Sequence, residues 1–262
     1  MNRSLLVKLF GFHATLIHGD TLVLDRWRWL KRRLPVTNNG EKVIDIGCGT
    51  GAFSLGAALR GYESLGLTWD TRDQITAALR AKLLNLHSAS FEVQDVRHLG
   101  ERRDLFHSYD VAICCENIEH ITNDRKLLTD IANCLKPGGR LLLTTPYLYY
   151  RPISAEDLGP FSRSEDGGHV RRGYTKAMLA ELCESSGLVL ERVSFCSGFL
   201  SQEITSLFRA LSRVHPIVGW IVIFPLRALP PLFDGLITAT THWTSFSICL
   251  EAYRPRFSRT TN

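Results

Sequence analysis

The stretch Val43-Ile44-Asp45-Ile46-Gly47-Cys48-Gly49-Thr50-Gly51-Ala52-Phe53 decides the fold of this 262-residue chain. A short apolar run, interrupted only by Asp45, is typical of a buried parallel strand. The glycines that follow let the backbone turn sharply and let a ligand approach the main chain closely. A helix that begins near Gly51 would present free N–H groups and the positive end of its dipole to that ligand. The stretch therefore predicts a strand, a ligand-binding turn and a helix.

The chain on either side of this stretch alternates between strand and helix patterns. We expect strands at 42–47, 62–68, 90–94, 109–115, 140–145, 188–195 and 245–253, and helices at 52–60, 72–86, 123–135 and after Thr175. This alternation predicts an α/β fold, with a Rossmann-like, seven-stranded, mostly parallel sheet and helices on both faces. In such a fold, ligands bind outside the carboxyl ends of the strands.

Two further segments flank the alternating pattern. Residues 1–40 are interpreted as an N-terminal cap of two amphipathic helices, which either cover one edge of the domain or form a lid that touches substrate or membrane. Residues 41–196 together with 244–254 would form the main domain. Residues 197–243 are an apolar insertion before the last strand, and three interpretations stay open: packing against 1–34, completion of an acceptor pocket, or contact with a bilayer interface.

Composition and charge narrow the class of protein. Apolar residues make up 45% of the chain and charged residues 22%, so a sizeable core is expected. The seven cysteines show no C-x-x-C or Cys/His ligand spacing, which favours reduced thiols, a cytoplasmic location and no bound metal. We find no convincing signal peptide and no apolar window long enough to span a bilayer.

The net charge of +5 is unevenly distributed. Basic and acidic residues number eight and three in 1–42, 17 and 20 in 43–200, and six and three in 201–262. A nucleic-acid enzyme would more often carry its basic residues across the catalytic domain. Basic ends suit an anionic membrane surface better, with ordinary solvated faces as the alternative. We therefore expect no nucleic-acid partner, and a peripheral membrane contact is one interpretation.

The glycine spacing distinguishes between cofactors. The glycines follow the pattern G-x-G-x-G and not the G-x-G-x-x-G of dinucleotide-binding proteins. Asp45 also precedes them inside the strand, where a carboxylate would suit an ammonium group and not a pyrophosphate. Three more motifs follow in order: Gln94-Asp95-Val96, Tyr109 to Ile121, and Leu135 to Leu143. Together they resemble the class I S-adenosylmethionine-dependent methyltransferases, in particular the small-molecule group that includes ubiquinone-biosynthesis methyltransferases.

The resemblance implies a cofactor, S-adenosylmethionine, and a set of residues that bind it. It places the methionyl part at the first motif, the adenine amino group at the carboxylate after strand three, and the transferred methyl group beside the motif of strand four. The implied cofactor-binding residues are Asp45, Gly47, Cys48, Gly49, Gly51, Asp95, Val96 and Glu116. The resemblance covers residues 40–195 and the last strand.

The residue expected to bind the ribose departs from the family pattern. The family usually ends strand two with an acid that binds both ribose hydroxyls, but Thr68 stands at that position here. Asp70 is our preferred substitute, and Thr68 with Asp73 is the competing assignment. Asp70 would otherwise be a plain helix N-cap.

Polar residues after strand four are candidates for the chemistry. An oxygen acceptor needs a base unless its hydroxyl is already ionised, and a histidine suits that role. His120 is the candidate base and Glu119 would orient it; the alternative is that both cap the next helix while Glu116 or Asn117 touches the cofactor. His169, in the polar loop at 146–174, is a further catalytic candidate. Arg171 and Tyr174 are candidates for substrate contact in the same loop, unless it is simply solvated.

These patterns together predict a methyltransferase that acts on a small or lipid-linked acceptor, with oxygen as the methylated atom. A protein or nucleic-acid methyltransferase is one alternative, but the Asn/Asp-Pro-Pro-Tyr type of motif is missing after strand four. A non-catalytic subunit that binds the cofactor and regulates a partner is the other alternative.

Overall fold

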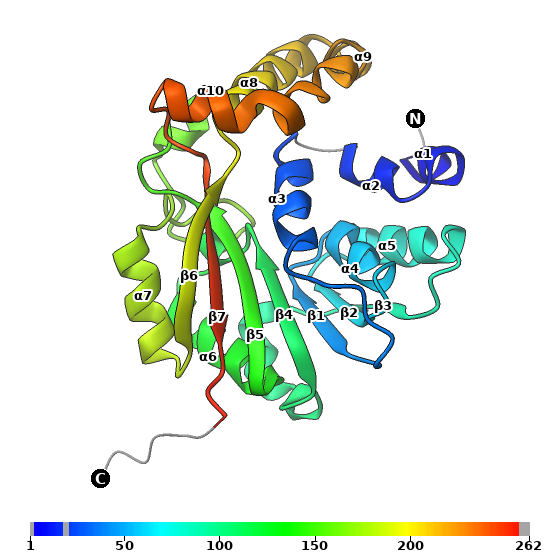
Figure 1. Ribbon diagram of the computed structural model, residues 1–262, viewed down its shortest axis with the longest axis vertical. Coiled ribbons are helices and arrows are strands. Elements are labelled where there is room, and N and C mark those ends of the chain that lie inside the picture. The colour runs from blue at the N-terminus through cyan, green and yellow to red at the C-terminus, as the bar shows by residue number, and fades with distance from the viewer. Residues whose placement is uncertain (1–2, 18–20, 257–262) are drawn as a thin grey trace.

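A seven-stranded sheet in the order β3-β2-β1-β4-β5-β7-β6 forms the centre of the computed structural model, which describes residues 3–17 and 21–256 (Figure 1). The strands are β1 (Lys42–Ile46), β2 (Glu63–Thr68), β3 (Ala89–Val93), β4 (Tyr109–Cys115), β5 (Leu135–Pro146), β6 (Val189–Cys196) and β7 (Ser247–Tyr253). Five neighbouring strands pair in parallel, whereas β7 runs antiparallel to both β5 and β6. The predicted fold class is therefore confirmed.

One strand begins earlier than the sequence predicts. Tyr109 pairs with Leu135, and the next pair along the ladder joins Val111 to Arg140, so residues 136–139 bulge out between them. Gly138 has a φ of +85°, a conformation that only glycine adopts easily, and it allows this bulge. The Pro-Gly-Gly turn thus lies within β5 and does not precede it.

Helices cover both faces of the sheet because strand side chains alternate between them. On one face lie α4 (Ala52–Ala58) and α5 (Thr71–Leu83), and on the other α6 (Asp124–Cys134) and α7 (Lys176–Ser185). Ile44 and Ile46 of β1 pack in the same cluster as α6 and α7, whereas Val43 packs in the cluster that holds α4 and α5. This alternation turns Asp45 toward α4.

The flanking segments are helical and lie together near the ends of the parallel strands (Figure 1). The N-terminal helices are α1 (Arg3–Phe10), α2 (His13–Ile17) and α3 (Leu22–Lys31), so the described residues contain three helices where the sequence predicts two. The insertion forms α8 (Phe199–Val214), α9 (Pro216–Leu226), a π-helical turn (Pro230–Asp234) and α10 (Gly235–Thr240). Trp220 donates a hydrogen bond to the Ile17 carbonyl, and Arg28 donates one to the Pro231 carbonyl. The insertion therefore contacts the N-terminal helices.

Candidate functional site

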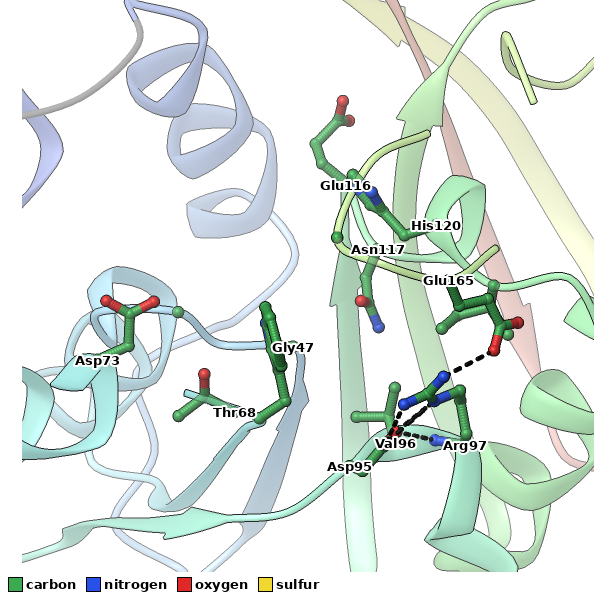
Figure 2. A pocket seen from close by; sticks show the side chains of 14 residues that line it. Gly47, Thr68, Asp73, Asp95, Val96, Arg97, Glu116, Asn117, His120 and Glu165 are labelled. Carbon is green, nitrogen blue, oxygen red and sulfur yellow. Dashed lines mark hydrogen bonds and ion pairs between the residues drawn. The ribbon is translucent and has the colours of Figure 1, made fainter. Parts of the chain in front are cut away.

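A cavity of about 230 Å³ lies just beyond the ends of β1, β2, β3 and β4, and we call it the first cavity (Figure 2). Its lining consists of Gly47, Gly49, Thr68, Trp69, Asp73, Asp95, Val96, Arg97, Glu116, Asn117, His120, Ile121, Glu165 and Gly167. Seven of the predicted site residues are among them: Gly47, Gly49, Thr68, Asp95, Val96, Glu116 and His120. The cavity thus lies where an open α/β sheet binds its ligands.

The glycines of the turn have two different roles. Gly47 and Gly49 line the cavity with left-handed φ values of +78° and +49°. A Cβ on Gly47 would lie 2.7 Å from the side chain of Asn117, whereas one on Gly49 would reach only Asp73, at 4.0 Å. Gly51 is outside the lining, and a Cβ there would lie 2.7 Å from the ring of Phe91. Contrary to the predicted ligand contact, Gly51 allows the helix to pack on the sheet.

Asp45 and Cys48 also lie behind the turn and not in the cavity lining. Both side chains are buried, and Asp45 accepts a hydrogen bond of 2.7 Å from the Ser54 hydroxyl of α4. Burial raises the pKa of Asp45 to about 6 from an ordinary value of 3.8, although the Ser54 hydrogen bonds oppose this rise. In this structure Asp45 fixes α4 to β1 beneath the turn.

The raised pKa of Asp45 predicts a pH-dependent stability. Between the ordinary pKa of 3.8 and the folded pKa of about 6, the folded protein keeps a proton on Asp45 that the unfolded chain has lost. The free energy of unfolding therefore falls as the pH rises through this range. The full cost above the folded pKa is about 3 kcal/mol. We expect Asp45→Asn to stabilise the protein by up to ~3 kcal/mol at about pH 8 and by much less at about pH 4. Urea unfolding at both pH values measures this, and an equal effect at both would contradict it.

The carboxylate that lies where the ribose is expected belongs to Asp73 and not to Asp70. Asp70 does not line the cavity; it caps α5 by accepting a 2.7 Å hydrogen bond from the backbone N–H of Arg72. It also pairs with the Arg72 guanidinium at 2.9 Å, at the protein surface. Thr68 and Asp73 do line the cavity, and Asp73 faces Gly49 across it. Asp70 thus lies outside the cavity lining, and the geometry favours the competing pair, Thr68 and Asp73.

Asp95 lies in the cavity lining within an ion-pair network that the sequence did not reveal. Both of its carboxylate oxygens accept hydrogen bonds of 2.9 Å from Nε of Arg97, and Arg97 also pairs with Glu165 at 3.0 Å (Figure 2). These hydrogen bonds from Arg97 lower the pKa of Asp95. Glu165 accepts a further bond from the Thr122 N–H. Asp95 is thus held ionised, and the loop at 165–167 is fastened over the cavity.

Glu116 is held by three elements that are distant in sequence. Its backbone has an unusual φ of +49°, and its Oε2 pairs with Arg26 of α3 at 3.0 Å. Its Oε1 accepts hydrogen bonds from the Thr144 hydroxyl of β5 at 3.0 Å and the Ser247 hydroxyl of β7 at 3.2 Å. The sequence offered no signal for Arg26, which joins the N-terminal helices to the wall of the cavity.

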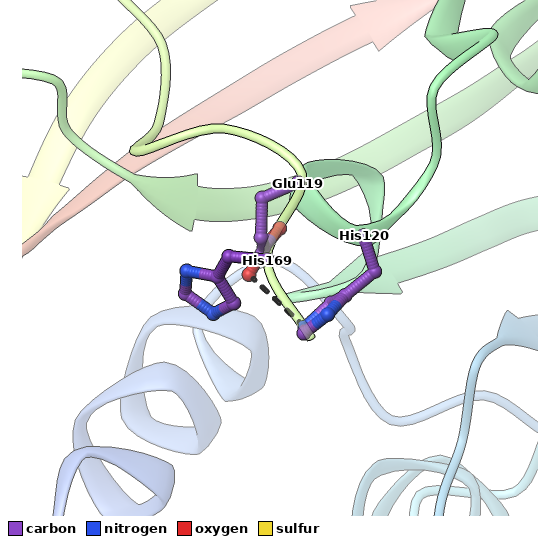
Figure 3. Close-up of side chains that lie close together, drawn as sticks. All are labelled: Glu119, His120 and His169. Carbon is purple, nitrogen blue, oxygen red and sulfur yellow. Dashed lines mark ion pairs between the residues drawn. The ribbon is translucent and has the colours of Figure 1, made fainter. Parts of the chain in front are cut away.

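The three catalytic candidates Glu119, His120 and His169 are brought together (Figure 3). The two imidazole rings lie 4.7 Å apart, nearly perpendicular, and Nε2 of His120 is 3.9 Å from Oε1 of Glu119. Burial, and then the charge of Glu116, raise the pKa of Glu119 well above its ordinary value, so we treat this carboxyl as neutral. Burial lowers the pKa of His169, which favours a neutral imidazole. His120 lines the first cavity, whereas Glu119 and His169 lie behind it.

The same cluster is also a set of metal ligands. One ligand atom from each of the three residues lies within 4.8 Å of the others. Two imidazoles and a carboxylate are a common protein ligand set for zinc. The cluster could therefore hold a divalent ion, which the cysteine and histidine spacing in the sequence did not indicate.

Arg171 and Tyr174 do not line the first cavity and bind the segment at 118–124 instead. Arg171 pairs with Asp124 and donates hydrogen bonds of 2.9 Å to the carbonyls of Ile121 and Thr122. Tyr174 is buried, and its hydroxyl donates to Asp124 at 2.9 Å. In this structure these side chains hold the loop in place, and their predicted contact with substrate stays a prediction.

Known proteins are similar to this chain in sequence. The family profile described as "Methyltransferase domain" matches residues 22–193. The chain is 31% identical over 183 residues to a "Ubiquinone biosynthesis O-methyltransferase" of Azoarcus sp. (strain BH72). The aligned region covers 66% of this chain and 73% of the relative. It is 32% identical to the protein of the same name from Neisseria meningitidis serogroup C (strain 053442), over 57% of this chain and 64% of the relative. The chain belongs to the class I S-adenosylmethionine-dependent methyltransferases.

The fold of this methyltransferase is shared with solved structures. A putative sarcosine dimethylglycine methyltransferase from Galdieria sulphuraria superimposes with a TM-score of 0.61 and 16% identity, over 88% of this chain and 85% of that chain. At this identity the likeness concerns the fold alone. The family membership shows that the chain is an enzyme and that its cofactor is S-adenosylmethionine.

The first cavity fits this cofactor. Asn117 lines the cavity, and its buried Nδ2 has no hydrogen-bond partner among the described residues. A buried donor of this kind is costly unless a ligand accepts its hydrogen bond. Thr68, Asp73 and Asp95 supply further polar groups that could bind ribose hydroxyls and an adenine amino group. When bound, the cofactor supplies a methyl group on a positively charged sulfur.

Proposed function

We propose that this methyltransferase transfers the methyl group to an oxygen atom of a small acceptor, with His120 as the base. The observation that carries the proposal is the environment of His120. Its Nδ1 lies 3.0 Å from the carbonyl oxygen of Gly168, which can only accept a hydrogen bond. The proton of a neutral His120 therefore resides on Nδ1, and Nε2 is left as a lone-pair acceptor.

The position of Nε2 suits removal of a proton from a hydroxyl. His120 lines the first cavity, and no hydrogen bond to its Nε2 is present in the part of the chain that the structure describes. Glu119 lies 3.9 Å away, beyond hydrogen-bond distance, and as a neutral acid it does not compete strongly for that proton. An acceptor hydroxyl beside His120 can thus pass its proton to Nε2 as its oxygen becomes the nucleophile.

The experiment identifies the methylated atom directly. The protein is incubated with S-adenosylmethionine labelled with carbon-13 in the methyl group, separately with the lipid, small-molecule and protein fractions of a cell extract. We expect the label to enter the lipid or small-molecule fraction with the NMR chemical shift of an O-methyl group. A shift typical of N-methyl or C-methyl, or label confined to the protein fraction, would overturn the proposal.

We further propose that the acceptor is lipid-linked and that the protein contacts a membrane through the insertion. Among the described residues no single helix is long and apolar enough to span a bilayer. The helical segments Pro216–Leu226 and Pro230–Thr240, bent by 47° relative to each other, together have the length and composition of a span. Ile221 and Leu232 of this region are 60% and 72% exposed. Large exposed apolar side chains that gather in one region mark interaction surfaces. The names of the relatives, which refer to ubiquinone biosynthesis, also favour a lipid-like acceptor.

Flotation with lipid vesicles tests the membrane contact. We expect the protein to float with vesicles of phosphatidylglycerol and phosphatidylcholine, because burial of each apolar side chain contributes about 1.5–3 kcal/mol. The double variant Ile221→Glu with Leu232→Glu should stay in the dense fraction. Ile75→Glu is the matched control, since Ile75 is 59% exposed on α5 and should leave flotation unchanged. Equal flotation of all three proteins would contradict the contact.

A further inference from the structure

A second cavity, of about 700 Å³, lies between the loop at 154–169 and helix α8 of the insertion. Its lining consists of Ser154, Asp157, Pro160, Phe161, Ser162, Gly168, His169, Phe208, Arg209, Ser212 and Arg213. The second cavity is next to the first, because Gly167 lines the first and Gly168 lines the second. The contacting rings of His120 and His169 lie between the two. Only the imidazole ring of His169 therefore separates His120, the proposed base, from the second cavity.

The lining of the second cavity is cationic on one side. Arg209 and Arg213 are one helical turn apart on α8, so they are neighbours on the helix surface. Asp157 is the acidic residue of the lining, and its Oδ2 already accepts hydrogen bonds from the backbone N–H groups of Ile153 and Ser154. At the shared wall the two charges of the lining act in opposite directions, because Asp157 raises the pKa of His169 and Arg209 lowers it, while burial and the neighbouring His120 lower it most.

The rest of the lining is mixed. Phe161, Pro160 and Phe208 supply apolar surface, and Ser162 and Ser212 supply hydroxyls. Arginine binds phosphate and carboxylate through parallel N–H groups, which makes it well suited to an anionic group. Apolar surface beside two guanidinium groups therefore matches a molecule with an anionic end and an apolar body.

We propose that the second cavity binds the methyl acceptor, and that this acceptor carries a phosphate or carboxylate group that Arg209 and Arg213 hold. This inference rests on the proposed function, in which His120 serves the acceptor hydroxyl. The apolar part of the acceptor lies against Phe161 and Phe208, and its hydroxyl reaches past His169 toward His120. Since α8 lies beyond residues 22–193, which the family profile matches, the anion site belongs to the insertion and not to the shared domain.

Binding of simple anions to the protein loaded with S-adenosylhomocysteine tests this inference. Isothermal titration uses decyl phosphate, decanoate and phenyl phosphate, with decyl glucoside as the neutral probe, all below the concentrations at which they form micelles. We expect at least one of the three anions to bind at least tenfold more tightly than decyl glucoside. The double variant Arg209→Gln with Arg213→Gln should lose at least tenfold in affinity for that anion and keep its affinity for S-adenosylhomocysteine. Arg103→Gln, on the exposed surface, is the matched control and should bind every probe as the wild type does.

The outcomes separate the sources of the anion and the two proposals. Equal binding of phenyl phosphate and decyl phosphate supports a small soluble acceptor, whereas binding of decyl phosphate alone supports a lipid headgroup. Stronger binding of decanoate supports a carboxylate. No preference for the anions, or full anion binding by the double variant, overturns the inference even if O-methylation is observed. Anion binding that depends on both arginines, without O-methylation, overturns only the proposed function.

Discussion

Gly49→Arg is expected to weaken binding of S-adenosylmethionine at least about 100-fold, equivalent to ~2.7 kcal/mol. Gly49 has a left-handed φ of +49°, and the space that its side chain would enter is the first cavity itself. A Cβ there meets only Asp73 Oδ2, at 4.0 Å, so the first atom of the new side chain does not collide with the protein. The arginine would instead occupy the cofactor volume and pair with Asp73. Isothermal titration with S-adenosylmethionine and S-adenosylhomocysteine measures the loss.

The matched control for this substitution is Gly187→Arg. Gly187 follows α7 with a φ of +74°, and nothing lies within 4 Å of a Cβ built on it. An arginine at position 187 therefore causes the same kind of backbone strain as an arginine at position 49, but outside the cavity lining. We expect the two variants to lose similar thermal stability, and only Gly49→Arg to lose binding. A Gly49→Arg protein that stays folded and binds the cofactor as the wild type does would show that the cavity is not the cofactor site.

His120→Ala is expected to lower kcat by about 10²–10⁴-fold, the range typical of a lost general base, and to leave cofactor affinity within a few-fold. The reason is that Nε2 of His120 faces the first cavity as a proton acceptor while Gly168 holds Nδ1. Steady-state rates of methyl transfer, with kcat and KM separated, measure the effect. Added imidazole should restore part of the rate to the variant, because it can supply the missing acceptor in the space that alanine leaves.

His98→Ala is the matched control, because it removes an imidazole ring that does not line the first cavity. His98 is exposed and pairs with Glu101 at 2.9 Å on the short helix Val96–Glu101, so His98→Ala should leave kcat unchanged. His169→Ala tests the neighbouring ring on its own. If His120→Ala keeps the wild-type rate, while His169→Ala loses it, the base is His169 and our assignment of His120 is wrong.

The local patterns around residues 43–53 and in the strand-and-helix units that follow were sufficient to predict the fold class. An apolar run, glycines at alternate positions and a helical pattern are all short-range features, and three further strand-and-helix units follow them along the chain. The β7 strand could be predicted from its composition, but its antiparallel place between β5 and β6 follows from pairing across the whole sheet. The sequence predicted only a mostly parallel sheet, and the place of β7 within it is a finding of the structure.

Some of the residues predicted from short motifs to bind the cofactor line the first cavity. Gly47, Gly49 and Asp95 belong to such motifs and do line the cavity. Asp70 and Asp73 lie three residues apart at the start of one helix, and their roles depend on which carboxylate turns back to cap it. That choice is set by the exact beginning of α5, which is the least reliable part of a sequence-based assignment.

The remaining features depend on contacts between distant segments. Arg26 reaches Glu116 from 90 residues away in the sequence, and Arg97 reaches Glu165 across the mouth of the cavity. The helices of the insertion were not predicted because prolines interrupt their apolar pattern. Pro216 occupies the first turn of α9, where a proline is tolerated, so it marks the beginning of a helix and not a break.

The hydrogen bond from Ser247 to Glu116 has a consequence for the order of synthesis. Among the described strands β7 is made after β5 and β6, yet it lies between them in the sheet. Until residues 247–253 emerge, β5 and β6 lack the partner between them, and the carboxylate of Glu116 lacks one of its donors. A nascent chain can therefore bury its first strands and their helices early, whereas the wall of the first cavity is completed only after β7 has been translated.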